Sequence, residues 1–160
     1  MNLKTKLLAL ASLSVIGAVM AGSAHYVRGP NAALGSPEVT VTWKAAGLGD
    51  TTLVEYRADA TGNARYQCVN HGGKCPAASN KQNVTGAVSA FGGFSSGKNG
   101  SITGSLTLDP PASTLNCPGS QVAALVSASF TNIRLSDLTN GVLDLATTPS
   151  SLAFAGPECP

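Results

Sequence analysis

The sequence predicts an all-β protein built as an antiparallel sandwich of two sheets. Apolar and polar residues alternate over 39–44 and again over 102–108, the period-two pattern of half-buried strands. Turn-forming dipeptides recur along the chain at a spacing of about 8–12 residues, as they do between short strands. No stretch shows a convincing helical period of 3.6 residues. Together these features favour about seven or eight short strands, typical of an immunoglobulin-like sandwich.

The N-terminal half is predicted to form a meander of hairpins. Residues 25–37 are expected to be a loop, because prolines at 30 and 37 punctuate them. Strands are then expected at 39–44, 51–58 and 64–69, joined by turns at Gly47–Asp50 and Thr61-Gly62-Asn63. Trp43, the only tryptophan, alternates in phase with Val39 and Val41, so we expect it in the core.

A polar loop from Asn70 to Gln82 separates the two halves. Strand character resumes at 84–91, and Asn99-Gly100 predicts a hairpin into the strand at 102–108. Pro110-Pro111 ends that strand, since proline cannot donate to a ladder, and a crossing loop runs to Ser120. The last strands are expected at 121–130, 133–138 and 142–145, followed by an extended tail over 147–160.

Residues 1–24 are typical of an export signal. Lys4 and Lys6 precede an apolar run from Leu7 to Met20 that is too short to span a membrane, and cleavage sites follow at Ala21 and Ala24. We therefore expect a secreted or periplasmic protein with one mature domain, residues 25–160, and no transmembrane segment.

Charge is sparse in the expected mature chain. The formal net charge of +2 comes from the two lysines of the signal, which leaves 8 basic and 8 acidic residues. Nucleic acids and anionic membranes are bound chiefly through clustered basic residues. We therefore expect neither as a partner.

The four cysteines predict two disulfides in an exported protein. The favoured pairing is Cys68–Cys117 with Cys75–Cys159, in which the first bond joins two sheet elements and the second ties down the tail. The alternative is Cys68–Cys75 with Cys117–Cys159. Spacing alone does not decide between them.

Three groups of residues have side chains of the types that carry catalysis or bind metals. Gly93–Gly97 matches G-x-S-x-G, but no histidine follows His71, so the order of a hydrolase triad is missing and no catalytic residue is named. Cys68, His71, Cys75 and Cys117 have the ligand types of a zinc site, which export disfavours. His25 would become the mature N-terminus after cleavage at Ala24, and its amine and ring nitrogens, with His71, suit copper.

Two resemblances bear on these residues. Ala24-His25, the Pro-punctuated segment and the strand Val39–Trp43 resemble the start of periplasmic copper-resistance binding proteins and of lytic polysaccharide monooxygenases. Both families are β-sandwiches that hold copper with a terminal histidine. This resemblance implies copper as the alternative cofactor, although the chain has no third histidine.

A broader resemblance covers most of the mature chain. The blocks His25-Tyr26-Val27, Ala46-Gly47-Leu48-Gly49, Cys68-Val69-Asn70-His71-Gly72-Gly73 and Leu115-Asn116-Cys117-Pro118 are similar to small exported bacterial proteins with a Cys-x-Asn-x-Gly-Gly block. That group has no assigned activity. The resemblance implies export, β architecture and the Cys68–Cys117 pairing.

The function expected from sequence is that of a binding or structural module and not of an enzyme. Its partner is expected to be a protein or a carbohydrate, contacted through the loops at 70–82 and 92–100, because loops on a rigid scaffold commonly carry binding residues. The candidate contact residues are Asn70, His71, Gly72, Gly73, Lys74, Phe94 and Lys98. Copper capture by His25 and His71 is the alternative.

Overall fold

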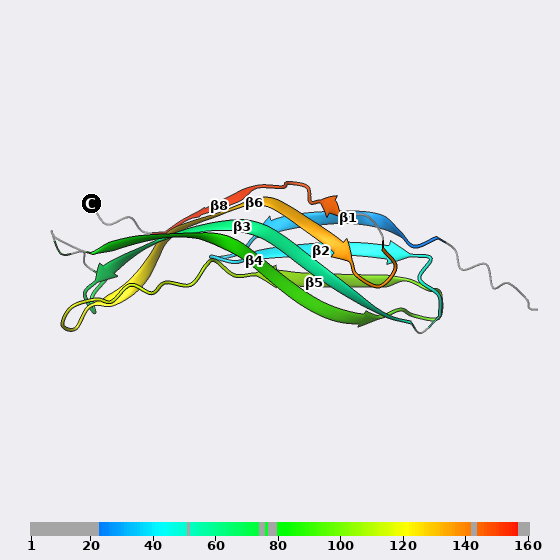
Figure 1. Cartoon of the computed structure of the whole chain (residues 1–160), viewed down its shortest axis with the longest axis horizontal. Helices are drawn as coiled ribbons and strands as arrows, with labels where there is room; N and C mark the ends of the chain where they lie inside the picture. The colour runs from blue at the N-terminus through cyan, green and yellow to red at the C-terminus, as the bar shows by residue number, and fades with distance from the viewer. Residues whose placement is uncertain (1–22, 51, 74–75, 77–79, 142–143, 157–160) are drawn as a thin grey trace, which may run out of the picture.

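The computed structural model describes residues 23–50, 52–73, 76, 80–141 and 144–156. Within these ranges there is no helix, so none is long and apolar enough to cross a membrane, and the chain forms two antiparallel sheets (Figure 1). The all-β prediction is therefore confirmed. Nearly all of the predicted export signal lies outside the described residues.

The first sheet, sheet A, has the strand order β1-β2-β5. Its strands are β1 (His25–Leu34), β2 (Val39–Ala46) and β5 (Ile102–Leu108). The second, sheet B, has the order β4-β3-β6-β7, and β8 also pairs with β6. Its strands are β3 (Leu53–Val69), β4 (Lys81–Ser95), β6 (Val122–Asp137), β7 (Leu145–Ala146) and β8 (Leu152–Ala155).

The core lies between the two sheets and is built by alternation. Val39, Val41 and Trp43 of β2 are buried, as predicted, against alternate residues of β3, β5 and β6. The Trp43 ring lies 4.8 Å from that of Tyr56 and 5.1 Å from that of Phe94, between ring centroids. A Cβ on Gly104 would lie 2.5 Å from the indole, so this glycine leaves the space that the tryptophan fills.

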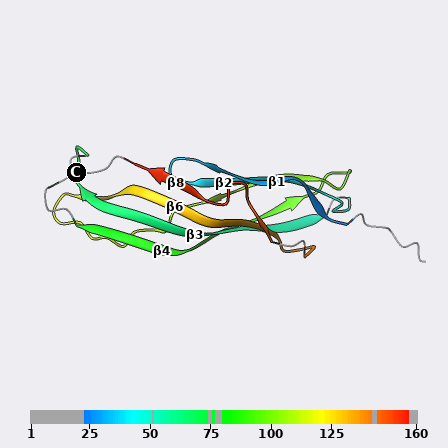
Figure 2. The ribbon, with the colours of Figure 1, turned by 90° about the horizontal axis from the view of Figure 1, so that it is seen from above.

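Sheet B is longer than sheet A and runs beyond it at the end where β3 finishes (Figures 1 and 2). We call the part where the sheets face each other the packed half. The other part, the distal half, consists of residues 61–69 of β3, 81–87 of β4 and 122–129 of β6 with β8. Over β3 and β4 its inner face is covered by the connection between β5 and β6, residues 109–121. On β6 and β8, Ala128, Leu152 and Phe154 belong to the core between the sheets or pack against it.

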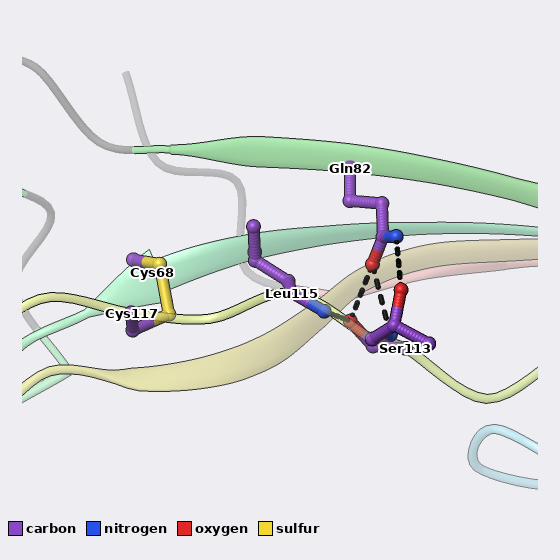
Figure 3. Close-up of a disulfide and its surroundings, with 6 residues drawn as sticks. Cys68, Gln82, Ser113, Leu115 and Cys117 are labelled. Atoms are coloured by element: carbon purple, nitrogen blue, oxygen red, sulfur yellow. Dashed lines mark hydrogen bonds between the residues drawn. A yellow bond between two sulfur atoms is a disulfide. The ribbon is translucent and has the colours of Figure 1, made fainter.

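Residues 109–121 are attached to β3 and β4 at three places. The Tyr66 hydroxyl donates to the carbonyl of Pro111 at 2.8 Å. The Gln82 amide bonds to Ser113 and Thr114, and a disulfide joins Cys68 to Cys117 (Figure 3). The predicted Cys68–Cys117 bond is confirmed, which excludes both the pairing of Cys68 with Cys75 and a zinc site built on Cys68 and Cys117.

The second predicted disulfide is not covered by these observations. Cys75 and Cys159 both lie outside the described residues, so their pairing stays a prediction.

The turn predicted at Thr61-Gly62-Asn63 is wrong. β3 continues through it, and Gly62 pairs with Gly86 on one side and Phe130 on the other. A Cβ at Gly62 would lie 2.8 Å from the Pro111 ring, so the residue is a point of close approach within a strand. In the same way β6 merges the two strands predicted at 121–130 and 133–138.

The hairpin predicted at Asn99-Gly100 is also wrong, because β4 and β5 belong to different sheets. The Ser96 hydroxyl donates to the carbonyl of Gly49, and Gly100 accepts a bond from the N–H of Leu48. These bonds hold the β4–β5 connection against the loop that precedes β3. The connection therefore crosses from one sheet to the other.

The loop predicted for residues 25–37 is largely a strand, β1. Gly29-Pro30 is accommodated by register shifts between Tyr26 and Asn31. β1 is an edge strand of sheet A, where a missing proline N–H is tolerated. Its outer edge bonds to Thr148, which links the two sheets on that side.

Candidate functional site

A shallow hollow of about 520 Å³ crosses four strands of the distal half of sheet B. Its polar lining comes from six side chains, two each from β3, β4 and β6. We call it the sheet B groove, defined by Asn63, Arg65, Asn83, Thr85, Ser127 and Ser129.

Strand alternation places these six side chains on the outer face of the sheet. Asn63 lies opposite Thr85 on one side and Ser129 on the other, and Arg65 in turn lies opposite Asn83 and Ser127. The residues between them, Ala64 and Ala128, line the same hollow but are buried on the core side. The open space is therefore on the outer face, where the two alanines contribute backbone.

The shape of the groove follows from side-chain size. On β6 and β8 its lining is serine and alanine, together with Phe154, which packs against the core. The neighbouring strands carry the longer side chains of Asn63, Arg65 and Asn83. The Thr85 hydroxyl donates to the Asn63 side chain at 2.6 Å, which fixes the amide.

Arg65 is the only charged residue of the lining. It forms no hydrogen bond or ion pair with another described residue, whereas Arg57, nearer the start of β3, is paired with Asp59 at 2.5 Å. A guanidinium offers five N–H donors in a planar fork that matches a carboxylate or sulfate group. The groove therefore presents free hydrogen-bonding capacity and one positive charge to solvent.

The first predicted contact loop lies at the distal end of the molecule. Asn70, His71, Gly72 and Gly73 are exposed in a turn directly after β3, closed by a bond from the N–H of Gly73 to the carbonyl of Asn70. The Cys68–Cys117 bond holds its stem. Lys74 lies outside the described residues.

The second predicted loop is at the opposite end. Lys98 is exposed in the turn between β4 and β5, whereas Phe94 belongs to β4 and not to a loop. Phe94 packs inward on Trp43 and Tyr56, because its position in the alternation faces the core. The two predicted loops therefore do not form one contact surface.

The two histidines are also far apart. His25 opens β1 beside Ala46, at the end of the molecule where Ser96 bonds to Thr52. His71 follows the far end of β3, whose 17 residues span about 55 Å at about 3.3 Å each. One ion cannot contact both within a single molecule. No group of three or more His, Cys, Asp or Glu residues gathers in the described ranges.

The packed half contains a buried polar cluster of Tyr26, Trp43, Tyr56 and Asp137. Burial, with the nearby Asp137 carboxylate, raises the pKa of Tyr56 to about 12, and burial likewise raises the pKa of Tyr26. Both phenols stay protonated at neutral pH. Asp137 accepts bonds from Thr139 and Asn140 and so fixes the turn after β6. The cluster lies inside the fold and contributes to its structure.

Sequence reasoning missed the groove because it placed Asn63 in a turn and looked for contacts in loops. A signal was present in the alternation of Asn63, Arg65 and Gln67 with Ala64 and Tyr66. Read as one strand, that pattern places two polar groove residues on a single face.

Comparison of the chain with protein-family models, with curated proteins and with solved structures finds no match.

Proposed function

We propose that this chain is an extracytoplasmic binding module that holds a hydroxylated, acidic ligand, such as a uronic-acid polysaccharide, in the sheet B groove. The observation that carries the proposal is the free guanidinium of Arg65 among amide and hydroxyl side chains in an open hollow. Export agrees with the sequence of residues 1–24 and with the disulfide.

The chemistry of the lining favours a carbohydrate over a protein ligand. Amides and hydroxyls both donate and accept, so they match the hydroxyl groups of a sugar chain. Arg65 supplies the charge that an acidic sugar requires. The lining lacks the exposed aromatic and aliphatic anchors that dominate protein interfaces, Phe154 being half-buried.

We assign the sandwich to the immunoglobulin-like type. Strands β1, β2 and β5 share one sheet and β3, β6 and β7 the other, as the corresponding strands do in a constant-type domain. The difference is β4, which pairs with β3 instead of joining the first sheet. This exchange gives sheet B the extra width on which the groove lies.

The test is a titration of the secreted protein with soluble polysaccharides, one rich in uronic acid and one neutral. Isothermal calorimetry should show binding of the acidic polymer. Arg65→Ala should weaken it about tenfold or more, since a charged hydrogen bond contributes about 1.5–3 kcal/mol. Arg28→Ala is the matched control, because Arg28 is an exposed arginine on sheet A without a described partner.

Binding that is equally strong in Arg65→Ala and in Arg28→Ala would contradict the groove as the site. Absence of binding to any acidic polymer would contradict the ligand class.

A further inference from the structure

The outer edge of β4 is the longest unpaired strand edge among the described residues. β4 ends sheet B and pairs with β3 alone (Figure 1). Just beyond the two ends of β4, the N–H of Cys68 donates to the carbonyl of Asn80, and the N–H of Ser96 donates to the carbonyl of Thr52. In an antiparallel ladder, pairs that exchange hydrogen bonds alternate with pairs that do not, so the even-numbered residues of β4 bond to β3. The N–H and C=O groups of the odd-numbered residues from Lys81 to Ser95 therefore point away from the sheet.

The other edges carry protection that β4 lacks. β1 is bonded to Thr148, β8 has four residues, and β5 ends before Pro110-Pro111. Natural sheets shield an open edge with short strands, prolines, charges or a covering segment. β4 has 15 residues, no proline, and Lys81 as its single charge.

We propose that β4 pairs antiparallel with β4 of a second copy of this chain, about a two-fold axis at Val88. The odd-numbered backbone groups then bond to each other along an interface about 50 Å long, at about 3.4 Å per residue over the 15 residues. Two copies of sheet B become one continuous sheet.

The side chains fit this register in size and charge. On the outer face the larger side chain of each pair lies opposite a smaller one, and Lys81 of each copy lies opposite a serine. The four pairs are Ala87 with Ser89, Thr85 with Phe91, Asn83 with Gly93 and Lys81 with Ser95. On the inner face Val84 meets Gly92 and Gly86 meets Ala90. No like charges lie directly opposite each other, so the pairing avoids the repulsion that destabilises antiparallel strands.

The pairing also adds a residue to the sheet B groove. Phe91 is 66% exposed on the outer face. In this register it lies across from Thr85 of the other copy, with the two Cβ atoms about 5.5 Å apart. Each groove thereby receives an aromatic ring from its neighbour, a surface on which a sugar ring stacks. This second element depends on the proposed function, whereas the pairing itself does not.

The test of the pairing is the mass of the secreted protein in solution, measured by sedimentation equilibrium at several concentrations. We expect a dimer. Ala87→Pro removes one outward N–H beside the axis and leaves the ladder to β3 intact, so it should yield a monomer. Ala87→Thr keeps the donor and should remain a dimer. The circular dichroism spectrum establishes that both variants fold.

A second pair of variants tests the register and does not depend on the proline. Ser95→Glu places a carboxylate opposite Lys81 of the other copy and should tighten the dimer, and Ser95→Lys should weaken it. Each variant is expected to change the Kd of the dimer by about twofold to tenfold. A cross-strand charge pair has a small effect by itself, and two such pairs form in each dimer. A monomeric wild type overturns the pairing, and so does a dimer in which these two variants behave alike.

The groove element has a separate readout. Ala87→Pro should bind the acidic polysaccharide more weakly than Ala87→Thr, although residue 87 is outside the groove. Equal affinity overturns the contribution of Phe91. If the wild type binds no polysaccharide, the proposed function and the Phe91 contribution both fail, while the measured mass still decides the pairing.

Discussion

The packed half and the distal half of sheet B are stabilised in different ways. In the packed half, alternate residues of two sheets bury a continuous core that includes Trp43, Tyr56 and Phe130. In the distal half residues 109–121 cover the inner face of β3 and β4, and buried residues such as Ala64 and Cys68 lie outside that core, whereas Ala128 of β6 still belongs to it. Hydrophobic packing between two sheets stabilises the first region, and in the second a disulfide and hydrogen bonds to the 109–121 segment add to a smaller apolar contact.

This difference leaves the outer face of the distal half open to solvent. The segment that covers the distal half lies on its inner face, and the outer face carries the sheet B groove. The molecule therefore combines a packed region that supplies stability with a thin region that presents side chains.

The largest effect is expected from truncation in the packed half. Trp43→Ala should lower the free energy of unfolding by about 3–5 kcal/mol, because it removes a buried ring against Tyr56 and Phe94. Denaturant titration measures the change. Val27→Ala, at an exposed position of β1, should change the free energy of unfolding by less than about 0.5 kcal/mol. Equal losses in the two variants would contradict the position of the core.

Removal of the crosslink is expected to have the next largest effect. The double variant Cys68→Ala/Cys117→Ala opens a loop with a sequence separation of 49 residues and should lower the free energy of unfolding by about 2–4 kcal/mol. The measurement is denaturant titration of the variant against wild type. An unchanged unfolding midpoint would show that the distal half does not need the bond.

Alkaline pH should weaken the packed half selectively. The pKa of Tyr56 is raised from 10.0 to about 12 by burial, so the folded state binds this proton more tightly than the unfolded state. Its contribution, about 2–3 kcal/mol for a shift of two units, is complete below pH 10 and is lost as the pH rises through 12. Unfolding followed from pH 8 to 12 should show this loss, and Tyr56→Phe should reduce it in part, because burial raises the pKa of Tyr26 as well.

The smallest effect is expected from one hydrogen bond in the distal half. Tyr66→Phe removes the donor to Pro111 and should cost about 1 kcal/mol. Thermal unfolding measures the change in stability. A loss as large as that from removal of the disulfide would mean that the 109–121 segment is held mainly by this bond.

The sequence predicted the features that depend on local pattern. Alternation located β2 and β5, placed Trp43 in the core, and indicated two antiparallel sheets. The strand-like residues around Cys68 and Cys117 favour their pairing, although Cys117 lies in the connection and not in a strand.

The features that sequence did not predict depend on distant contacts. In the sequence Gly62 resembles a turn residue, but in the structure it lies within a strand, and Pro111, far along the chain, packs on it. Asn99-Gly100 has the sequence of a hairpin turn, but in the structure Ser96 and Gly100 are hydrogen bonded to the loop before β3. The groove was missed for the same reason, since it requires β3 to continue through Gly62.

The most direct test of the difference between the halves is native-state hydrogen exchange on the Cys68→Ala/Cys117→Ala variant. We expect backbone amides of residues 63–68 and 123–128 to exchange much faster than in wild type, while those of residues 54–60 keep their protection. A uniform increase over the whole of β3 would contradict the account, because both halves would then unfold as one unit.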